Sequence, residues 1–200
     1  MTKLVLKTIL KTLLCVVILG ALIYGVLALF FPSTLANGYN KLGSYNLSIK
    51  YYEKTYEKSG SFDDLVVLCD RVDEENDSIR AEKYLKILTT DNNFEVYFEA
   101  YDKLQGTQIV FTSIDFYTGK HVLATYNAQG LDKAISLANN YVSNYGYNKF
   151  SPYGFLISTY LDKMEDSDKQ KIKTALNAIL ESDIPEDQKA NISADLGLLN

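Results

Sequence analysis

The stretch STLANGYNKLGSYNLSIKYYEKTYEKSG, residues 33–60, decides the fold of this chain. Two groups of apolar and small residues recur within it at helical spacing: Leu35, Ala36 and Tyr39, then Ile49, Tyr52 and Tyr56. Residues three or four apart lie on one face of a helix, so each group predicts an amphipathic helix. Gly43 interrupts the pattern between the groups, and Gly60 follows the second group as a C-terminal cap. The stretch therefore predicts two antiparallel helices joined by a short turn.

This helix–turn–helix resembles a tetratricopeptide repeat. The resemblance rests on the positions where that family has Gly, Tyr, a small residue, an aromatic residue and a second small residue, here Gly43, Tyr45, Ser48, Tyr52 and Thr55. Ser48 and Thr55 stand where the family usually has alanine, and Gly60 stands near its usual proline. The resemblance implies an α-solenoid of antiparallel helix pairs, whose concave face binds a protein or peptide.

A second unit repeats this pattern 33 residues later. Six apolar or small positions of the first unit have counterparts at that offset: Leu68, Cys69, Val72, Ala81, Leu85 and Leu88. The family period is about 34 residues. Ser61 with Asp64, and then the run 76–78, supply N-terminal caps for the two helices. The shared offset predicts an array rather than an isolated hairpin.

We expect three more helix pairs and a short last helix in the remainder of the chain. Their apolar positions group at 97–101 with 110–117, at 122–126 with 134–141, and at 155–160 with 172–180. Ser151-Pro152 and Ser167 with Gln170 are the expected helix starts of the fifth pair, and the last helix begins at Pro185. The predicted fold class is all-α.

The segment 107–127 leaves one alternative open. It is rich in Ile, Val, Thr and Phe, and Thr118-Gly119-Lys120 would form a turn at its centre. These residue types favour strands, so the segment also fits a β-hairpin.

A continuous apolar segment precedes the array. Leu13–Phe31 contains 19 residues without a charge, and a helix of that length spans close to the ~30 Å hydrocarbon core of a bilayer. We therefore divide the chain into a basic cytoplasmic tail (1–12), a transmembrane helix (13–31) and a helical-repeat domain (32–200). Three lysines precede the span, whereas the first twenty residues after it carry two. The positive-inside rule then places the tail in the cytoplasm and the domain outside the cell membrane.

A cleaved signal peptide is the alternative interpretation of the same segment. Pro32 breaks the helix, and Thr34 and Ala36 are suitable small residues before a cut after Ala36. The apolar run, however, exceeds the roughly 7–15 residues of a signal core. Cleavage would also remove Leu35 and Ala36 from the first repeat helix. We expect a retained anchor, with a secreted helical domain as the outcome if cleavage occurs.

The predicted function is partner binding by a membrane-anchored repeat module. Tyr51 and Tyr45 are the candidate partner-binding residues, because Tyr52 occupies the packing position in the first unit and exposed aromatic residues suit interfaces. Ala21 and Gly25 form a small-xxx-small pair, the candidate face for packing the span against another membrane helix. That pair motivates the alternative function, a structural subunit of a membrane protein assembly.

The remaining features argue against other classes. Residues 32–200 carry a formal charge of −8, whereas a nucleic-acid partner requires a basic surface. His121, the only histidine, has no neighbouring nucleophile, so we expect a surface residue and no enzyme. An EF-hand loop starting at Asp73 would place Ser78 and Tyr84 at positions that require Gly and Glu. We expect no metal and no cofactor. The chain is rich in Lys, Asn, Tyr and Ile and lacks Trp, a composition that we expect of an AT-rich bacterial genome.

Overall fold

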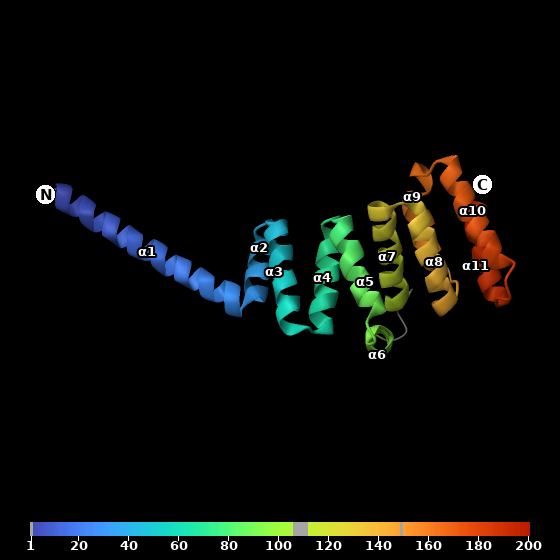
Figure 1. Ribbon diagram of the computed structural model, residues 1–200, viewed down its shortest axis with the longest axis horizontal. Coiled ribbons are helices and arrows are strands. Elements are labelled where there is room, and N and C mark those ends of the chain that lie inside the picture. The colour runs from blue at the N-terminus through green and yellow to red at the C-terminus, as the bar shows by residue number, and fades with distance from the viewer. Residues whose placement is uncertain (1, 106–111, 149) are drawn as a thin grey trace. The chain divides into compact units, whose positions relative to one another are not determined.

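The computed structural model of the protein describes residues 2–105, 112–148 and 150–200. Every regular element in these ranges is a helix and none is a strand, which confirms the predicted all-α class (Figure 1). The chain divides into two compact units, residues 1–71 and 72–200.

The first unit begins with the long helix α1, Thr2–Phe30. Its segment Val5–Phe30 is long and apolar enough to cross a membrane, and its most apolar stretch is not buried against the rest of the described chain. Phe31 leaves the helical conformation, with φ −133° and ψ 55°, and Pro32 opens the next helix. Proline has no backbone N–H to donate and suits the first turn of a helix, which explains why the break falls where the sequence predicts it.

Helices α2 (Pro32–Lys41) and α3 (Tyr45–Ser59) form the predicted hairpin. Ala36 and Ile49 are buried between them. The Ser48 hydroxyl donates a hydrogen bond of 2.9 Å to the carbonyl oxygen of Ala36, so this buried hydroxyl has a partner at a position where the repeat pattern usually has alanine. Gly60 ends α3 with φ 60°, the left-handed conformation that glycine adopts without strain.

Helix α4 (Phe62–Glu74) starts at the predicted cap, where the backbone N–H of Asp64 donates to the Ser61 hydroxyl at 3.1 Å. Leu65, Leu68 and Cys69 of this helix are buried, and Cys69 is only 1% exposed. Cys69 is thus a small core residue, a role that buried cysteine often has.

The second unit comprises the last turn of α4 and seven further α-helices in the described ranges. These are α5 (Ser78–Thr90), α6 (Phe94–Gln105), α7 (Ser113–Gln129), α8 (Leu131–Tyr145), α9 (Pro152–Tyr160), α10 (Asp166–Leu180) and α11 (Glu186–Leu198), with a 3₁₀ turn at Leu161–Lys163. Asp77 caps α5 and Ser151 caps α9, as predicted. Helix α10 instead begins at Asp166 with Glu165 as its N-cap, so the capping box predicted at Ser167 is wrong.

Helix α7 corrects the prediction for the centre of the chain. It runs unbroken through 113–129, where the sequence suggested either two separate helices or a β-hairpin. The first residues of the predicted hairpin, including Val110, lie in the segment 106–111, which is outside the described ranges. Gly119 does not form a turn. A β-carbon on Gly119 would lie 2.5 Å from Cγ of Phe155 in α9, so this glycine allows the close approach of the two helices.

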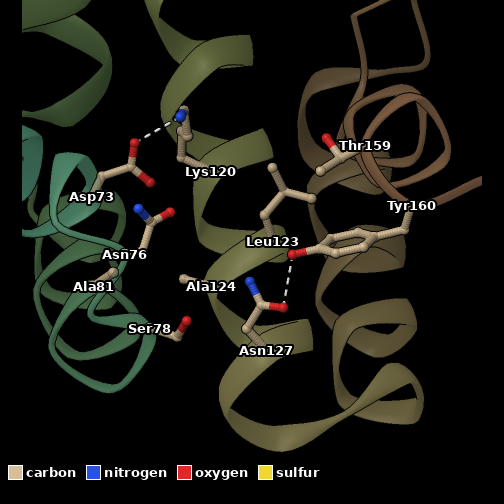
Figure 2. A pocket seen from close by; sticks show the side chains of 10 residues that line it. All are labelled: Asp73, Asn76, Ser78, Ala81, Lys120, Leu123, Ala124, Asn127, Thr159 and Tyr160. Atoms are coloured by element: carbon tan, nitrogen blue, oxygen red, sulfur yellow. Dashed lines mark hydrogen bonds and ion pairs between the residues drawn. The ribbon is translucent and has the colours of Figure 1, made fainter. Parts of the chain in front are cut away.

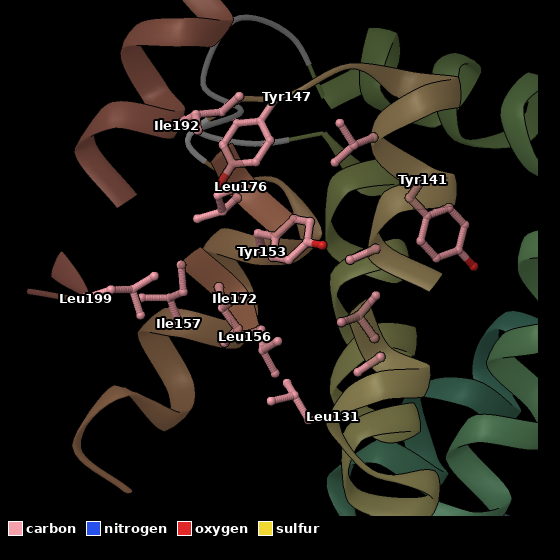
Figure 3. Packing of buried hydrophobic residues seen from close by; sticks show 14 of the residues in the cluster. Leu131, Tyr141, Tyr147, Tyr153, Leu156, Ile157, Ile172, Leu176, Ile192 and Leu199 are labelled. Carbon is pink, nitrogen blue, oxygen red and sulfur yellow. The ribbon is translucent and has the colours of Figure 1, made fainter. Parts of the chain in front are cut away.

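The C-terminal core joins α8, α9, α10 and α11 with one side of α7. Figure 3 shows its largest side chains, which meet between these helices: Tyr147, Tyr153, Leu156, Ile157, Ile172, Leu176, Ile192 and Leu199. The two buried tyrosines keep hydrogen-bond partners: Tyr153 donates to the side-chain oxygen of Asn139 at 2.8 Å, and Tyr147 donates to the Asp195 carboxylate at 2.5 Å. Because Ile192 is the buried residue of an otherwise mostly polar α11, this helix closes the core with one face and meets solvent with the other.

Candidate functional site

The most informative side chain of the second unit is His121 in the middle of α7. It is 3% exposed, so the expectation of a surface histidine is wrong. Its Nδ1 atom lies 2.6 Å from the hydroxyl oxygen of Tyr141 in α8 and 3.2 Å from Oγ1 of Thr89 in α5. The histidine therefore connects three helices that lie side by side (Figure 1).

The hydrogen bonds around His121 form a directed chain. Tyr141 donates to Oγ1 of Thr89 at 2.8 Å, and Thr89 donates in turn to the carbonyl oxygen of Leu85 at 2.8 Å. Because the single proton of each hydroxyl is used in this way, the oxygen of Tyr141 accepts from His121. This network assigns the proton of the neutral imidazole to Nδ1.

The surroundings keep this histidine neutral. Burial, with the positive charge of Lys86 as the second cause, lowers the pKa of His121 from 6.5 to about 4. Burial also raises the pKa of Tyr141, so that its hydroxyl stays protonated. At neutral pH the cluster is uncharged, and its two hydroxyls and Nδ1 are hydrogen-bonded to one another, which suits a structural connection between helices more than proton transfer.

A groove of about 610 Å³ lies directly beside this cluster, between α5, α7 and α8. Nearly all of its lining residues carry a polar group, although the aliphatic and aromatic parts of these side chains also face the groove: Glu82, Lys86, Thr89, Thr90, His121, Thr125, Gln129, Lys133, Ser136, Leu137, Asn140, Tyr141, Asn144 and Tyr145. Hydroxyls and side-chain amides both donate and accept hydrogen bonds, so this lining matches a ligand with many polar groups. The two lysines outnumber the single glutamate, which favours a ligand with negative charge.

One hydroxyl of the groove lacks a partner within the described residues. Thr125 is 4% exposed, and its Oγ1 atom makes no hydrogen bond there. Most buried hydroxyls in proteins are hydrogen-bonded, because an unpaired one costs about 1–3 kcal/mol. Thr125 lies one turn after His121 in α7, so an unsatisfied polar group lines the same groove as the buried histidine.

A smaller cleft of about 270 Å³ lies along the neighbouring face of α7, next to the end of α4, the start of α5 and α9. Figure 2 shows two polar pairs in it. Lys120 Nζ lies 2.6 Å from a carboxylate oxygen of Asp73, and the Tyr160 hydroxyl donates to the side-chain oxygen of Asn127 at 2.7 Å. Since these four polar groups are already paired with each other, they are less available to a ligand.

The structure places the predicted partner-binding residues in the first unit. Tyr51 is 5% exposed, stacks on Tyr39 with ring centres 5.7 Å apart, and has its hydroxyl 2.5 Å from that of Tyr24. The expectation that Tyr51 is open to a partner is therefore wrong. Tyr45, on the first turn of α3, is 47% exposed and accessible. Whether it binds a partner remains a prediction.

The span-packing pair lies on α1, where Ala21 is exposed and Gly25 is half-buried. A β-carbon on Gly25 would meet no atom within 4 Å, so nothing in the described chain occupies that face. The pairing of this face with another membrane helix stays a prediction.

Sequence reasoning missed the groove because its key residues are far apart along the chain. Thr89, His121 and Tyr141 come from three helices and are separated by 20 to 52 residues. The one available signal was the spacing of His121, Thr125 and Gln129, which lie four residues apart and therefore share one face of α7. Comparisons with protein-family models, with curated proteins and with solved structures give no match.

Proposed function

We propose that this chain is a membrane-anchored helical-repeat module of the tetratricopeptide type, and that it binds a polar, acidic protein or peptide segment in the α5–α7–α8 groove. The observation that carries this proposal is the groove itself, with its buried His121 cluster on one wall and lysines at its rim. The 33-residue offset between the first two helix pairs supports the repeat family.

The groove chemistry favours a peptide over a small apolar ligand. Leu137 is the one large aliphatic side chain among its lining residues, whereas small-molecule sites are mostly apolar. An extended peptide presents backbone N–H and C=O groups at regular intervals, and the side-chain amides of Gln129, Asn140 and Asn144 pair with both. Lys86 and Lys133 would attract an acidic side chain.

The anchor is the second part of the proposal. Helix α1 has the length and composition of a membrane span, and its basic tail favours a cytoplasmic N-terminus. Ala36 is fully buried in the α2–α3 hairpin, and its carbonyl oxygen holds the Ser48 hydroxyl. Cleavage after Ala36 would break this packing, which favours retention of the anchor over secretion.

The groove is tested by site-specific photo-crosslinking of the full chain in membranes. A photoreactive residue replaces Leu137 in the groove and, in a matched control, Lys103 on α6, which is 78% exposed. We expect a discrete adduct from position 137 that the double substitution Lys86→Glu with Lys133→Glu abolishes. Equal labelling at both positions, or an adduct that persists after charge reversal, would contradict the proposal.

The alternative is a structural subunit held by its span. The most apolar stretch of α1 is not buried in the described chain, and Ala21 and Gly25 offer a face for close helix packing. Replacing Ala21 and Gly25 by leucine distinguishes the two functions. Loss of a membrane complex with groove crosslinking intact supports the subunit role, whereas an unchanged complex excludes it.

A further inference from the structure

The first hairpin folds back along the membrane helix. Tyr51, in the middle of α3, meets Tyr24, which lies six residues before the end of α1. At the other end of α3, Lys58 Nζ donates to the carbonyl oxygen of Phe30 at 2.8 Å and lies 5.8 Å from the centre of the Phe30 ring. From Lys58 towards the N-terminal end of α3, the contacts therefore move along α1 from its C-terminal end towards its N-terminus. Figure 1 shows α2 and α3 beside the C-terminal end of α1.

The turn between α2 and α3 therefore lies on the membrane side of the end of α1. This tip exposes large apolar side chains: Leu42 is 79% exposed, Tyr45 is 47% exposed and Leu47 is 42% exposed. Exposed aliphatic residues with an amphipathic tyrosine are typical of segments at the boundary between headgroups and acyl chains. In water the same residues would form an unfavourable apolar tip.

The charges around the tip have one sign. The first acidic residue of the whole chain is Glu53, so residues 1–52 contain five lysines and no carboxylate side chain. Lys41 and Lys50 flank the tip, and both are exposed. By contrast, residues 53–200 contain all 25 acidic residues and only 15 basic ones. Lysines beside an apolar tip match the phosphates of anionic lipid headgroups.

We propose that the α2–α3 tip is a second membrane contact, in which Leu42, Tyr45 and Leu47 enter the headgroup boundary and Lys41 and Lys50 pair with anionic lipid phosphates. This inference rests on the proposed membrane anchor. It assigns lipid, rather than a peptide, to the exposed face of Tyr45. It also fixes the angle of the first unit, because the bilayer then holds the chain at two points joined by the Tyr24–Tyr51 and Lys58–Phe30 contacts.

Depth-dependent fluorescence quenching of the full chain in vesicles tests this contact. Cys15 and Cys69 are replaced by alanine, and a polarity-sensitive dye is attached to one new cysteine, in Leu42→Cys, Ile18→Cys or Ile79→Cys. Ile18 lies within α1, whereas Ile79 lies on α5 and is 76% exposed, so the latter is the matched apolar control. Brominated lipids quench the dye only where it enters the bilayer.

The vesicles consist of phosphatidylcholine alone or of an equal mixture with phosphatidylglycerol. We expect quenching at positions 18 and 42 and none at 79, with stronger quenching at 42 in the anionic mixture. Quenching at 18 without quenching at 42, or equal quenching at 42 and 79, would overturn the tip contact while leaving the anchor intact. No quenching at 18 would overturn the anchor itself, and the tip contact with it.

The lysines are tested in the same vesicles. Each lysine at an anionic surface contributes a factor of about five to binding, so Lys41→Gln with Lys50→Gln should lower the docked-to-undocked ratio of the tip about 25-fold. Lys103→Gln with Lys163→Gln is the control and should change nothing. If quenching at position 42 changed neither with the substitution of Lys41 and Lys50 nor with the charge of the lipid, the proposed pairing of these lysines with lipid phosphates would be overturned.

Discussion

The Nδ1 atom of His121 lies 2.6 Å from the hydroxyl oxygen of Tyr141, in a cluster that fastens α7 to α8 and, through Thr89, to α5. These are the three helices that build the groove. The rigidity of the groove wall therefore depends on a neutral histidine with a defined tautomer, and this dependence can be measured.

Acidification should weaken the fold through His121. The pKa of this group is about 4 in the folded state and near 6.5 in the unfolded state, so the unfolded chain binds the extra proton between these values. Stability is therefore complete above pH 6.5 and is lost as the pH falls towards 4. Between pH 7 and pH 5 we expect a loss of about 2 kcal/mol.

Urea unfolding at a series of pH values measures this loss. His121 is the only histidine, so His121→Gln removes the histidine contribution without touching the carboxylates. The variant should be less stable at pH 7 but should show a flatter pH dependence between 7 and 5. Parallel curves for the two proteins would mean that His121 titrates normally in the fold.

Removing the Tyr141 hydroxyl should destabilise the second unit. In Tyr141→Phe, Nδ1–H of His121 loses its nearer acceptor and Thr89 loses a donor, so only the 3.2 Å contact between these two groups is left, and poorly paired buried groups cost about 1–3 kcal/mol. Tyr101→Phe, at a residue that is 46% exposed, is the matched control with an expected change near zero. Thermal unfolding followed by circular dichroism compares the two variants with the unchanged protein. If Tyr141→Phe and the unchanged protein had the same midpoint temperature, the Tyr141 hydroxyl would contribute nothing to stability.

Substitution of Gly119 should separate α7 from α9. Alanine usually stabilises a helix by up to about 1 kcal/mol relative to glycine. Here the added β-carbon would lie 2.5 Å from Cγ of Phe155, and overpacking of this kind costs about 1–3 kcal/mol. We therefore expect Gly119→Ala to be net destabilising.

A double-mutant cycle identifies the cause. Phe155→Leu should recover part of the stability lost in Gly119→Ala, because the smaller side chain leaves room for the methyl group. Gly197→Ala in α11, where a β-carbon would meet no atom within 4 Å, should be neutral or stabilising. Additive effects of the changes at 119 and 155 would exclude the proposed steric contact.

The Tyr147–Asp195 bond should hold the last helix in place. Burial, with the hydrogen bond to Asp195 as the second cause, raises the pKa of Tyr147, and burial raises the pKa of the Asp195 carboxyl. Tyr147→Phe leaves that carboxylate without its donor and should cost about 2 kcal/mol. Compared with the unchanged protein, Tyr147→Phe should accelerate amide hydrogen exchange more in α11 than in α5. Equal acceleration in both helices would contradict a local role for this hydrogen bond.

Local sequence signals predicted the parts of the fold that local physics determines. The left-handed Gly60, the caps at Ser61, Asp77 and Ser151, and the Pro32 break all follow from short-range backbone chemistry. Gly119 was read as part of a turn for the same reason. Glycine is needed at position 119 because Phe155 of α9 approaches the α7 backbone there, and a long-range contact of this kind leaves no local pattern in the sequence.

The candidate site was beyond sequence reasoning for a related reason. Tyr51 and Tyr52 are adjacent and both aromatic, yet both are buried, because Tyr24 and Tyr39 cover the first while α2 covers the second. The contacts of Tyr51 with Tyr24 in α1 and Tyr39 in α2 decide its burial, not helical spacing. Likewise, the burial of His121 follows from the packing of α5 and α8 on α7.

The most direct measurement of the central claim is peptide binding by the full chain in lipid nanodiscs. A random peptide library is selected on this protein, and the affinity of the selected peptides is compared between charge-reversal variants. We predict polar peptides enriched in Asp and Glu, whose binding falls at least tenfold in Lys86→Glu with Lys133→Glu and is unchanged in Lys103→Glu with Lys163→Glu. Apolar peptides, or peptides that bind both variants equally, would contradict a binding groove between α5, α7 and α8.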